Sequence, residues 1–330
     1  MNNKLKYSGV AIVLLGAAAW FGPKVSYDGF DNLPLKMDIG IDNVEQYVKD
    51  KEAKVVGIKP DNESRIVWAD SVRQTEYAVV YLHGFSASQG EGMPVHTDFA
   101  KRYGCNLYLP RLAFHGLKDP NAFKDFTPKE LVNSAKEAIA VGKTLGKKVI
   151  LMSCSTGGTL SVYLAANNPE ISSLLLFSPN IDIADKRSGL LTGPWGSQMM
   201  KLIENGDYHS WEAPKEAEKY WYLKYRNEGV LALKYLINQT MTDEIFQQIK
   251  QPVYLAYYYK DDQHQDNVVS VDRMKYFFGK ISTPKKLKRS SAFPNADTHM
   301  IPSGIFSKQI PDIEKDLFDF TENVLHIPAK

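Results

Sequence analysis

One serine of this chain stands where a nucleophile would be expected. The segment Lys148–Gly158 reads KVILMSCSTGG, an apolar run that passes into small residues. In a nucleophile elbow a strand turns sharply into a helix, so the residues two before and two after the serine must be small. Ser153 and Gly157 meet this requirement around Ser155, although the usual G-x-S-x-G pattern has glycine where Ser153 stands. The segment predicts Ser155 as a nucleophile.

The alternative interpretation of the same segment is a glycine-rich turn of an ordinary α/β protein that cradles a phosphate. A P-loop needs Gly-Lys-Ser or Gly-Lys-Thr, and a dinucleotide site needs G-x-G-x-x-G. Neither pattern occurs in Lys148–Gly158. The serine elbow is therefore the favoured interpretation.

A second turn lies earlier in the chain, where HGFSAS follows the apolar run Tyr77–Leu82. A tetrahedral oxyanion needs two preorganised donors, one from the residue after the nucleophile and one from the loop after an earlier strand. The backbone N–H groups of Thr156 and Phe85 fit these two positions. Taken alone, the His-Gly turn would indicate only the end of a strand.

Three motifs together resemble the α/β-hydrolase superfamily: HGFSAS, then PRLAFHG at Pro110–Gly116, then SCSTGG. Within it, the chain is similar to the carboxylesterase and monoglyceride-lipase-like group of serine hydrolases with a helical cap. The resemblance covers roughly Glu76 to Val324. It implies a triad in the chain order serine, acid, histidine, with the acid after a late strand and the histidine after the last one.

Both places are occupied in this chain. Asp266 resembles the acid of the family because Asn-Val-Val-Ser follows it, whereas Asp262 fits better by its distance from the preceding strand. We expect Asp266 to be the acid, with Asp262 as the alternative. His299 lies in a polar loop near the end of the chain, where the family carries its general base. An imidazole can take the Ser155 proton at neutral pH and return it to a leaving alcohol.

We expect His83 to be structural beside the oxyanion loop and His115 to be a turn residue near the pocket. The remaining histidines are expected as helix, cap or surface residues, and they are His96, His209, His264 and His326. The two cysteines, Cys105 and Cys154, are expected to be buried and unpaired. No spacing of His, Cys and carboxylates indicates a metal site, and a serine triad needs no cofactor.

Short apolar runs alternate with helical stretches, as in the βαβ units of a doubly wound, mostly parallel sheet. The expected strands are Lys54–Lys59, Arg65–Ala69, Tyr77–Leu82, Asn106–Leu109, Lys148–Met152, Ser173–Phe177, Pro252–Tyr259 and Lys285–Arg289. The expected helices are Val95–Tyr103, Pro128–Leu145, Gly158–Asn167, Val271–Phe278 and Ile310–Leu325. A capping box, Thr127-Pro128-Lys129-Glu130, predicts the start of the second helix.

Roughly 75 residues rich in Trp and Tyr separate the strand that ends at Phe177 from the one that begins at Pro252. This is about twice what a single crossover needs. We expect a helical cap at 181–250, inserted into an α/β core formed by 26–180 and 251–330. Within the first part, residues 26–75 are expected to form the leading antiparallel strands of the sheet.

The composition excludes several classes of protein. The chain has 330 residues, 44% hydrophobic and 24% charged, and only 2 Cys, so it is not disordered, collagenous or held together by disulfides. Its 40 Lys and Arg against 38 Asp and Glu give a net charge of +2. Because no strong positive field is present, nucleic acid is not an expected partner.

The N-terminal residues have the features of a targeting segment. Lys4 and Lys6 precede the apolar run Gly9–Phe21, whose length fits the core of a signal peptide. Tyr7, Trp20 and Phe21 are aromatic residues of the kind that sit at membrane interfaces, which favours a retained anchor. We expect residues 1–25 to be a signal or membrane anchor, with a buried helix as the remaining alternative. In the first two interpretations the catalytic domain lies outside the cytosol, on the periplasmic or extracellular side.

The expected activity is hydrolysis of a small-molecule ester or lipid-like substrate through an acyl-enzyme on Ser155. A serine at the elbow argues against the haloalkane dehalogenase and epoxide hydrolase relatives, which need an aspartate nucleophile. Thioesterase, peptidase and acyltransferase activities use the same triad and stay open. A noncatalytic, membrane-tethered ligand-binding module is a further alternative. The sequence gives no indication of the oligomeric state.

Overall fold

The computed structural model describes residues 21–330, in which seven strands form one sheet of order β1-β3-β2-β4-β5-β8-β9. The strands are β1 (Arg65–Val67), β2 (Thr75–Leu82), β3 (Asn106–Leu109), β4 (Gly146–Cys154), β5 (Ile171–Phe177), β8 (Val253–Tyr257) and β9 (Lys288–Ala292). β1 pairs antiparallel with β3, and every other pair in this sheet is parallel. The expected α/β class with a mostly parallel sheet is confirmed.

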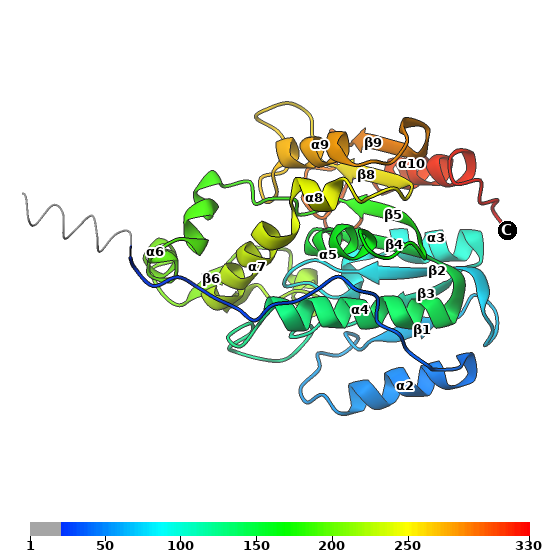
Figure 1. Cartoon of the computed structure of the whole chain (residues 1–330), viewed down its shortest axis with the longest axis horizontal. Helices are drawn as coiled ribbons and strands as arrows, with labels where there is room; N and C mark the ends of the chain where they lie inside the picture. The colour runs from blue at the N-terminus through cyan, green and yellow to red at the C-terminus, as the bar shows by residue number, and fades with distance from the viewer. Residues whose placement is uncertain (1–20) are drawn as a thin grey trace, which may run out of the picture.

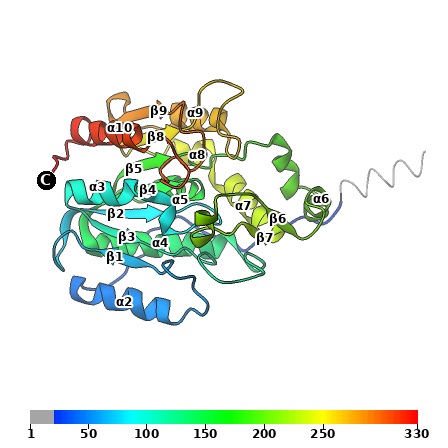
Figure 2. The same ribbon diagram turned by 180° about the vertical axis from the view of Figure 1, so that it is seen from behind.

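Helices cover both faces of this sheet (Figures 1 and 2). They are α2 (Ile41–Ala53), α3 (Val95–Tyr103), α4 (Pro128–Leu145), α5 (Thr156–Ala165), α9 (Val271–Lys280) and α10 (Ile310–Asn323). Successive side chains of a strand point to opposite faces. On β2, Val80 and Leu82 join the core under α4 and α5, whereas Val79 and Tyr81 join the core under α3 and α10. The central strands are therefore apolar throughout because both of their faces are buried.

The segment between β5 and β8 forms the cap, at the opposite end of the molecule from the C-terminus (Figure 1). Its elements are η2 (Lys186–Thr192), α6 (Gly196–Ile203), β6 (Tyr208–Ser210), η3 (Lys215–Lys219), β7 (Lys224–Arg226), α7 (Asn227–Thr240) and α8 (Asp243–Phe246). The antiparallel pair β6–β7 was not expected in a helical cap. Each of these strands has only three residues, which is too short to give an alternating pattern.

Hydrogen bonds join the cap to the core beside the HGFSAS turn. The Tyr222 N–H donates to the Ser86 carbonyl over 2.8 Å, and the Tyr222 hydroxyl donates to the Phe114 carbonyl over 3.0 Å. The Lys59 ammonium donates to the Trp221 carbonyl over 2.8 Å. This end of the cap is therefore held firmly over the turn that follows β2.

The expectation for residues 26–75 is wrong in part. The helix α2 occupies much of this segment, β1 is its single strand in the sheet, and Lys54–Lys59 contributes only an isolated bridge from Ile58 to Leu117. The buried residues of α2, namely Val44, Val48 and Glu52, are spaced by four. That spacing is the period of a helix buried on one side, so the pattern in the sequence was helical.

The β9 strand also departs from the expectation. It begins at Lys288 after a short helical turn, η4 (Lys285–Leu287), and so lies three residues later than the expected Lys285–Arg289. The predicted start of α4 is confirmed: Thr127 is the N-cap, and its hydroxyl oxygen accepts the Glu130 N–H. The Glu130 carboxylate accepts the Thr127 hydroxyl over 2.7 Å.

The expected anchor at 1–25 lies almost entirely outside the described residues. From Phe21 the chain runs along the cap before it reaches α2 (Figure 1, dark blue). The Trp195 N–H donates to the Pro23 carbonyl over 2.8 Å, which holds this stretch against the start of α6. Within residues 21–330, no helix combines the length and the apolar character that a membrane crossing needs.

Candidate active site

Ser155 stands on a strained turn between β4 and α5. Its backbone has φ 52° and ψ −121°, a conformation that side chains of L-residues rarely adopt. Four backbone bonds hold it. Ser155 N–H donates to Phe177 O, and Ser155 O accepts from the N–H groups of Gly158, Thr159 and Asn180. A sharp strand-to-helix turn of this kind presents the serine side chain to the space beyond the sheet.

The small neighbours of Ser155 are required by close packing. A Cβ added to Gly157 would lie 1.8 Å from the Leu82 carbonyl oxygen, so no larger residue fits there. The serine at the usual position of the first glycine is accommodated differently, because Ser153 Oγ accepts a hydrogen bond from Ser161 Oγ of α5 over 3.0 Å. The departure from the usual pattern therefore leaves the turn intact.

His299 and Asp266 form a buried pair. His299 Nδ1 lies 2.6 Å from Asp266 Oδ2, and the aspartate side chain is fully buried. Asp266 Oδ1 accepts hydrogen bonds from the backbone N–H groups of Val268 and Val269 over 2.9 and 3.0 Å. The carboxylate is thus fixed by two donors and presents its other oxygen to the imidazole.

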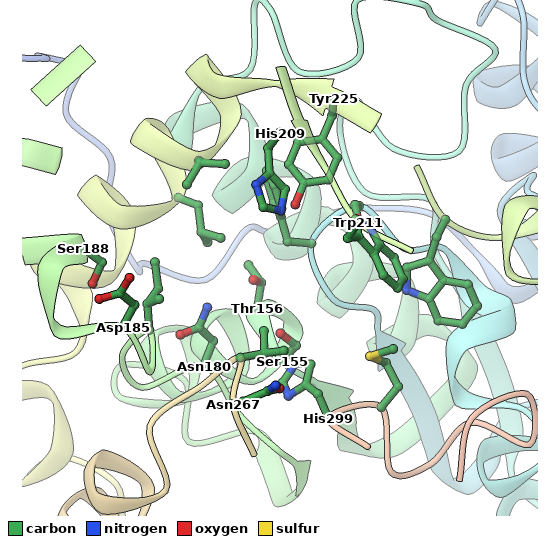
Figure 3. Close-up of a pocket in the computed structure, with 18 of the residues that line it drawn as sticks. Ser155, Thr156, Asn180, Asp185, Ser188, His209, Trp211, Tyr225, Asn267 and His299 are labelled. Carbon is green, nitrogen blue, oxygen red and sulfur yellow. The ribbon is translucent and has the colours of Figure 1, made fainter. Parts of the chain in front are cut away.

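The second nitrogen of the imidazole is free to accept a proton. His299 Nε2 is buried and has no hydrogen-bond partner within residues 21–330. Burial disfavours the imidazolium, but the charge and hydrogen bond of Asp266, with the charge of Glu91, outweigh it and raise the pKa of His299. Ser155 and His299 line the same pocket, and Figure 3 shows them beside each other.

The other aspartates of the same loop lie elsewhere. Asp262 Oδ1 accepts a hydrogen bond from the Tyr259 hydroxyl over 2.9 Å, and Asp261 pairs with His264 on the exposed part of the loop. Of the two aspartates considered as the acid, the structure thus brings Asp266 to His299 and leaves Asp262 at the surface.

The two expected oxyanion donors flank the same pocket. Thr156 is the first residue of α5, Phe85 follows β2, and both line the pocket of Ser155. Neither backbone N–H donates to an acceptor within residues 21–330. The Phe85 ring is held in place by stacking on Phe123, with ring centroids 4.4 Å apart.

His83 and His115 are buried, and both rings contact the backbone. His83 Nε2 accepts a hydrogen bond from the Leu112 N–H over 3.1 Å, and its Nδ1 lies 2.9 Å from the Gly84 carbonyl, to which it therefore donates. Burial lowers the pKa of His83 to about 4, so it stays neutral. His115 packs against His83 with ring centroids 4.9 Å apart.

The pocket over Ser155 is a cavity of about 560 Å³ between core and cap. Figure 3 shows His209, Trp211 and Tyr225 of the cap across from Ser155 and His299. The cap supplies an apolar wall made by Ile183, Leu191, Met200, Ile203, Val230 and Leu233. A pocket of this size and lining suits an apolar group of a small molecule.

Sequence reasoning missed several polar residues of this pocket, among them His209 and Glu91. His209, expected as a cap or surface residue, lines it with its Nδ1 3.1 Å from Glu204 Oε1. Glu91 also lines it, although nothing in the local sequence marks this glutamate.

The part of the chain that the structure describes holds no group of three or more His, Cys, Asp or Glu that could bind a metal ion. Cys105 and Cys154 are free and buried, and burial raises the pKa of both thiols.

No known protein-family profile matches the chain. A curated relative, the thermostable monoacylglycerol lipase of Bacillus sp. (strain H-257), is 29% identical over 115 residues. That match spans 35% of this chain and 45% of the relative.

Similar solved structures cover far more of the chain. One comes from the work on LipS and LipT, metagenome-derived lipolytic enzymes, with a TM-score of 0.64, 15% identity and coverage of 81% of this chain and 99% of that one. Another is the monoacylglycerol lipase of Paleococcus ferrophilus, with a TM-score of 0.56, 15% identity and coverage of 78% and 96%. The expected resemblance is confirmed at the level of the fold: this chain has the α/β-hydrolase fold, and its relatives include lipases and esterases.

Proposed function

We propose that this protein is a lipase- or esterase-like hydrolase that cleaves carboxylic esters through an acyl-enzyme on Ser155. The observation that carries the proposal is the buried His299–Asp266 pair, whose imidazole has an unpartnered nitrogen in the pocket of a strained serine. Relatives by sequence and by structure that are lipases support the same activity.

The proposed reaction begins when Ser155 Oγ attacks the acyl carbon while His299 Nε2 takes the serine proton. Asp266 holds the Nδ1–H tautomer and stabilises the imidazolium. The negative charge on the carbonyl oxygen is bound by the N–H groups of Thr156 and Phe85. When the tetrahedral intermediate collapses, His299 donates its proton to the leaving alcohol. Water then attacks the acyl-enzyme by the same route and releases the acid.

The proposed substrate is a small ester with an apolar acyl or alcohol group, including a lipid-like one. The apolar cap wall and the cavity of about 560 Å³ support this choice, because a drug-sized apolar ligand fits such a volume. A thioester, a peptide bond or an acyl acceptor other than water would use the same residues. Direct comparison of these substrates at Ser155 decides among them.

The test is hydrolysis of p-nitrophenyl esters of increasing chain length, with Ser155→Ala and His299→Ala as controls. We expect a chain-length optimum that is lost in both variants, and labelling of the wild type, but not of Ser155→Ala, by a fluorophosphonate. Undiminished hydrolysis by Ser155→Ala would contradict the assignment. An unreactive Ser155 with retained binding of an apolar ligand would favour a noncatalytic binding module.

We further propose that the N-terminal segment attaches the protein to a membrane and that the catalytic domain lies outside the cytosol. The run Gly9–Phe21, with Lys4 and Lys6 before it, supports this. The described residues begin at Phe21, which is 83% exposed, and they start beside α6, whose Leu202 is also 83% exposed. Large apolar side chains exposed together are typical of a contact surface.

Fractionation of cells tests this second proposal. Full-length protein is expected in the membrane fraction after an alkaline carbonate wash, whereas a chain that starts at Lys24 should be released. N-terminal sequencing of the mature protein distinguishes a retained anchor from a cleaved signal. Recovery of the full-length, uncleaved protein in the cytosol would refute the proposal.

A further inference from the structure

A buried carboxyl group beside Ser155 has no part in the chemistry described above. Glu91 belongs to the short turn η1 (Gln89–Gly92), and it is only 1% exposed although it lines the pocket. Its Oε2 accepts hydrogen bonds from the Gly84 N–H over 2.7 Å and from the Tyr81 hydroxyl over 3.0 Å. The side chain therefore ties the end of β2 to the turn that follows it.

Glu91 and Ser155 both pack against Gly84. A Cβ added to Gly84 would lie 2.6 Å from Glu91 Oε1 and 3.0 Å from Ser155 Cβ. There is thus no room for a side chain at residue 84, and the carboxyl group packs where one would stand. It contacts the turn from the same side as the proposed nucleophile.

The Gly84 N–H belongs to the peptide immediately before the one that carries the Phe85 N–H. Contacts on either side of Phe85 limit its freedom. Its ring stacks on Phe123, and the next carbonyl, that of Ser86, accepts the N–H of Tyr222 from the cap. On the other side, the Gly84 carbonyl, which shares a peptide with the Phe85 N–H, accepts hydrogen bonds from His83 Nδ1 over 2.9 Å and from the Ala87 N–H over 3.3 Å. The bond from the Gly84 N–H to Glu91 holds the preceding peptide, so its loss would leave Gly84, which has no side chain of its own, fixed on one side only.

Burying a carboxyl group costs free energy, because its charged form loses contact with water. Burial raises the pKa of Glu91 to about 7, against the opposing effects of Gly84, Tyr81 and the charge of His299. An apolar side chain would fill the space without that cost, but it could not accept the Gly84 N–H. The titratable groups around it are Tyr81 on β2, Cys154 on β4 and His299.

We propose that Glu91 is a positioning residue for the hydrolysis, whose carboxyl oxygen fixes the Gly84 N–H and thereby aims the Phe85 N–H at the oxyanion. The inference rests on the proposed function, because the oxyanion exists only if Ser155 attacks an acyl carbon. Glu91 acts through Gly84 and Phe85 and forms no bond to the reacting atoms.

Three substitutions of Glu91 distinguish the position of its acceptor oxygen from its negative charge. Glu91→Gln keeps an oxygen at the same distance but removes the charge. Glu91→Asp keeps the charge but withdraws the carboxyl by about 1.5 Å, the length of one C–C bond. Glu91→Met keeps the length of the side chain with no oxygen acceptor and buries no charge. Glu244→Asp, at an exposed position in α8, is the matched control.

We expect kcat of Glu91→Gln to stay within about 3-fold of wild type, whereas kcat of Glu91→Asp and Glu91→Met falls on the order of 10²-fold. KM should change by less than about 3-fold in all three, because the oxyanion forms only in the transition state. The affinity for an alkylboronic acid, which forms a tetrahedral adduct on serine, should fall in parallel with kcat. A residue with a purely structural role would not separate kcat from KM in this way.

The proposal is overturned if Glu91→Asp or Glu91→Met keeps kcat within about 3-fold of wild type, or if Glu91→Gln falls as far as they do. If Glu91→Asp does not fold, the result for Glu91→Met decides the question, because methionine places no unpaired charge in the core. Ser155→Ala is assayed alongside. If Ser155→Ala remains active, both the proposed function and the role of Glu91 are wrong. If Ser155→Ala is inactive but the Glu91 variants are unimpaired, only the role of Glu91 is wrong.

Discussion

Asp266→Asn is predicted to lower kcat by about 10⁴-fold while the protein stays folded. The reason lies in the two oxygens of this carboxylate. Oδ1 accepts the N–H groups of Val268 and Val269, and Oδ2 faces His299 Nδ1 at 2.6 Å. Each oxygen is needed as an acceptor, and an amide has only one.

The amide introduced by Asp266→Asn can adopt only one of its two orientations without loss. If its NH₂ group faced the backbone, donors would meet the N–H groups of both Val268 and Val269 in a buried site. The amide oxygen will therefore keep the two backbone donors and turn the NH₂ group toward His299. Nδ1 must then accept, so the proton moves to Nε2, and the imidazole can no longer take the proton of Ser155.

The loss of about 10⁴-fold corresponds to about 5.4 kcal/mol of transition-state stabilisation, at 1.36 kcal/mol for each factor of ten. Because both backbone bonds are retained, the free energy of unfolding should change by less than about 1 kcal/mol. The large loss of rate and the small loss of stability together distinguish a change of tautomer from local unfolding.

The assay is steady-state hydrolysis of a p-nitrophenyl ester, with urea unfolding of the same samples. Asp262→Asn is the matched control: this exposed aspartate pairs with Tyr259, so its kcat should stay within about 2-fold of wild type. The reasoning is refuted if Asp266→Asn retains more than about a tenth of kcat, or if Asp262→Asn shows the large loss instead.

Further predictions concern pH, the pocket and stability. The pKa of His299 is raised, and this imidazole must be neutral to act as a base. The rise of kcat/KM with pH should therefore have its midpoint above the ordinary histidine pKa of about 6.5. A midpoint below that value would contradict the assigned environment of His299. Leu233→Trp, in the apolar wall, should lower kcat/KM for long-chain more than for short-chain esters; equal loss for both would show that the acyl chain lies elsewhere. Glu52→Leu removes the buried partner of Arg111, 2.8 Å away, and should cost about 3–5 kcal/mol of unfolding free energy in urea melts, whereas a change below about 1 kcal/mol would contradict burial of the pair.

Local motifs carried most of what the sequence could predict. The elbow around Ser155 and the capping box before α4 depend on neighbours within a few residues, so their signals are visible without the fold. The buried strands β2, β4 and β5 are apolar runs, and they too lie close to where they were expected. Features that depend only on neighbouring residues can therefore be predicted from the local sequence.

Contacts between distant segments were less visible. The choice between Asp266 and Asp262 depended on which one reaches a histidine 33 residues further on. Glu91 has no local signature, because a lone glutamate in a turn does not show that it will be buried against Tyr81 and Gly84. The helix α2 was missed for a different reason: Glu52 is buried through its pair with Arg111, so a charged residue occupied the apolar face.

The backbone of Ser155 has a consequence for how the protein can change over time. A serine at φ 52° and ψ −121° costs about 1–3 kcal/mol, and glycine would adopt the same turn with little strain. Selection for stability alone would therefore favour glycine at residue 155, a replacement that also removes the hydroxyl group of the proposed nucleophile. At this residue, higher thermal stability and the proposed catalytic activity require different side chains. A more stable variant that keeps the activity must therefore gain its stability elsewhere in the fold.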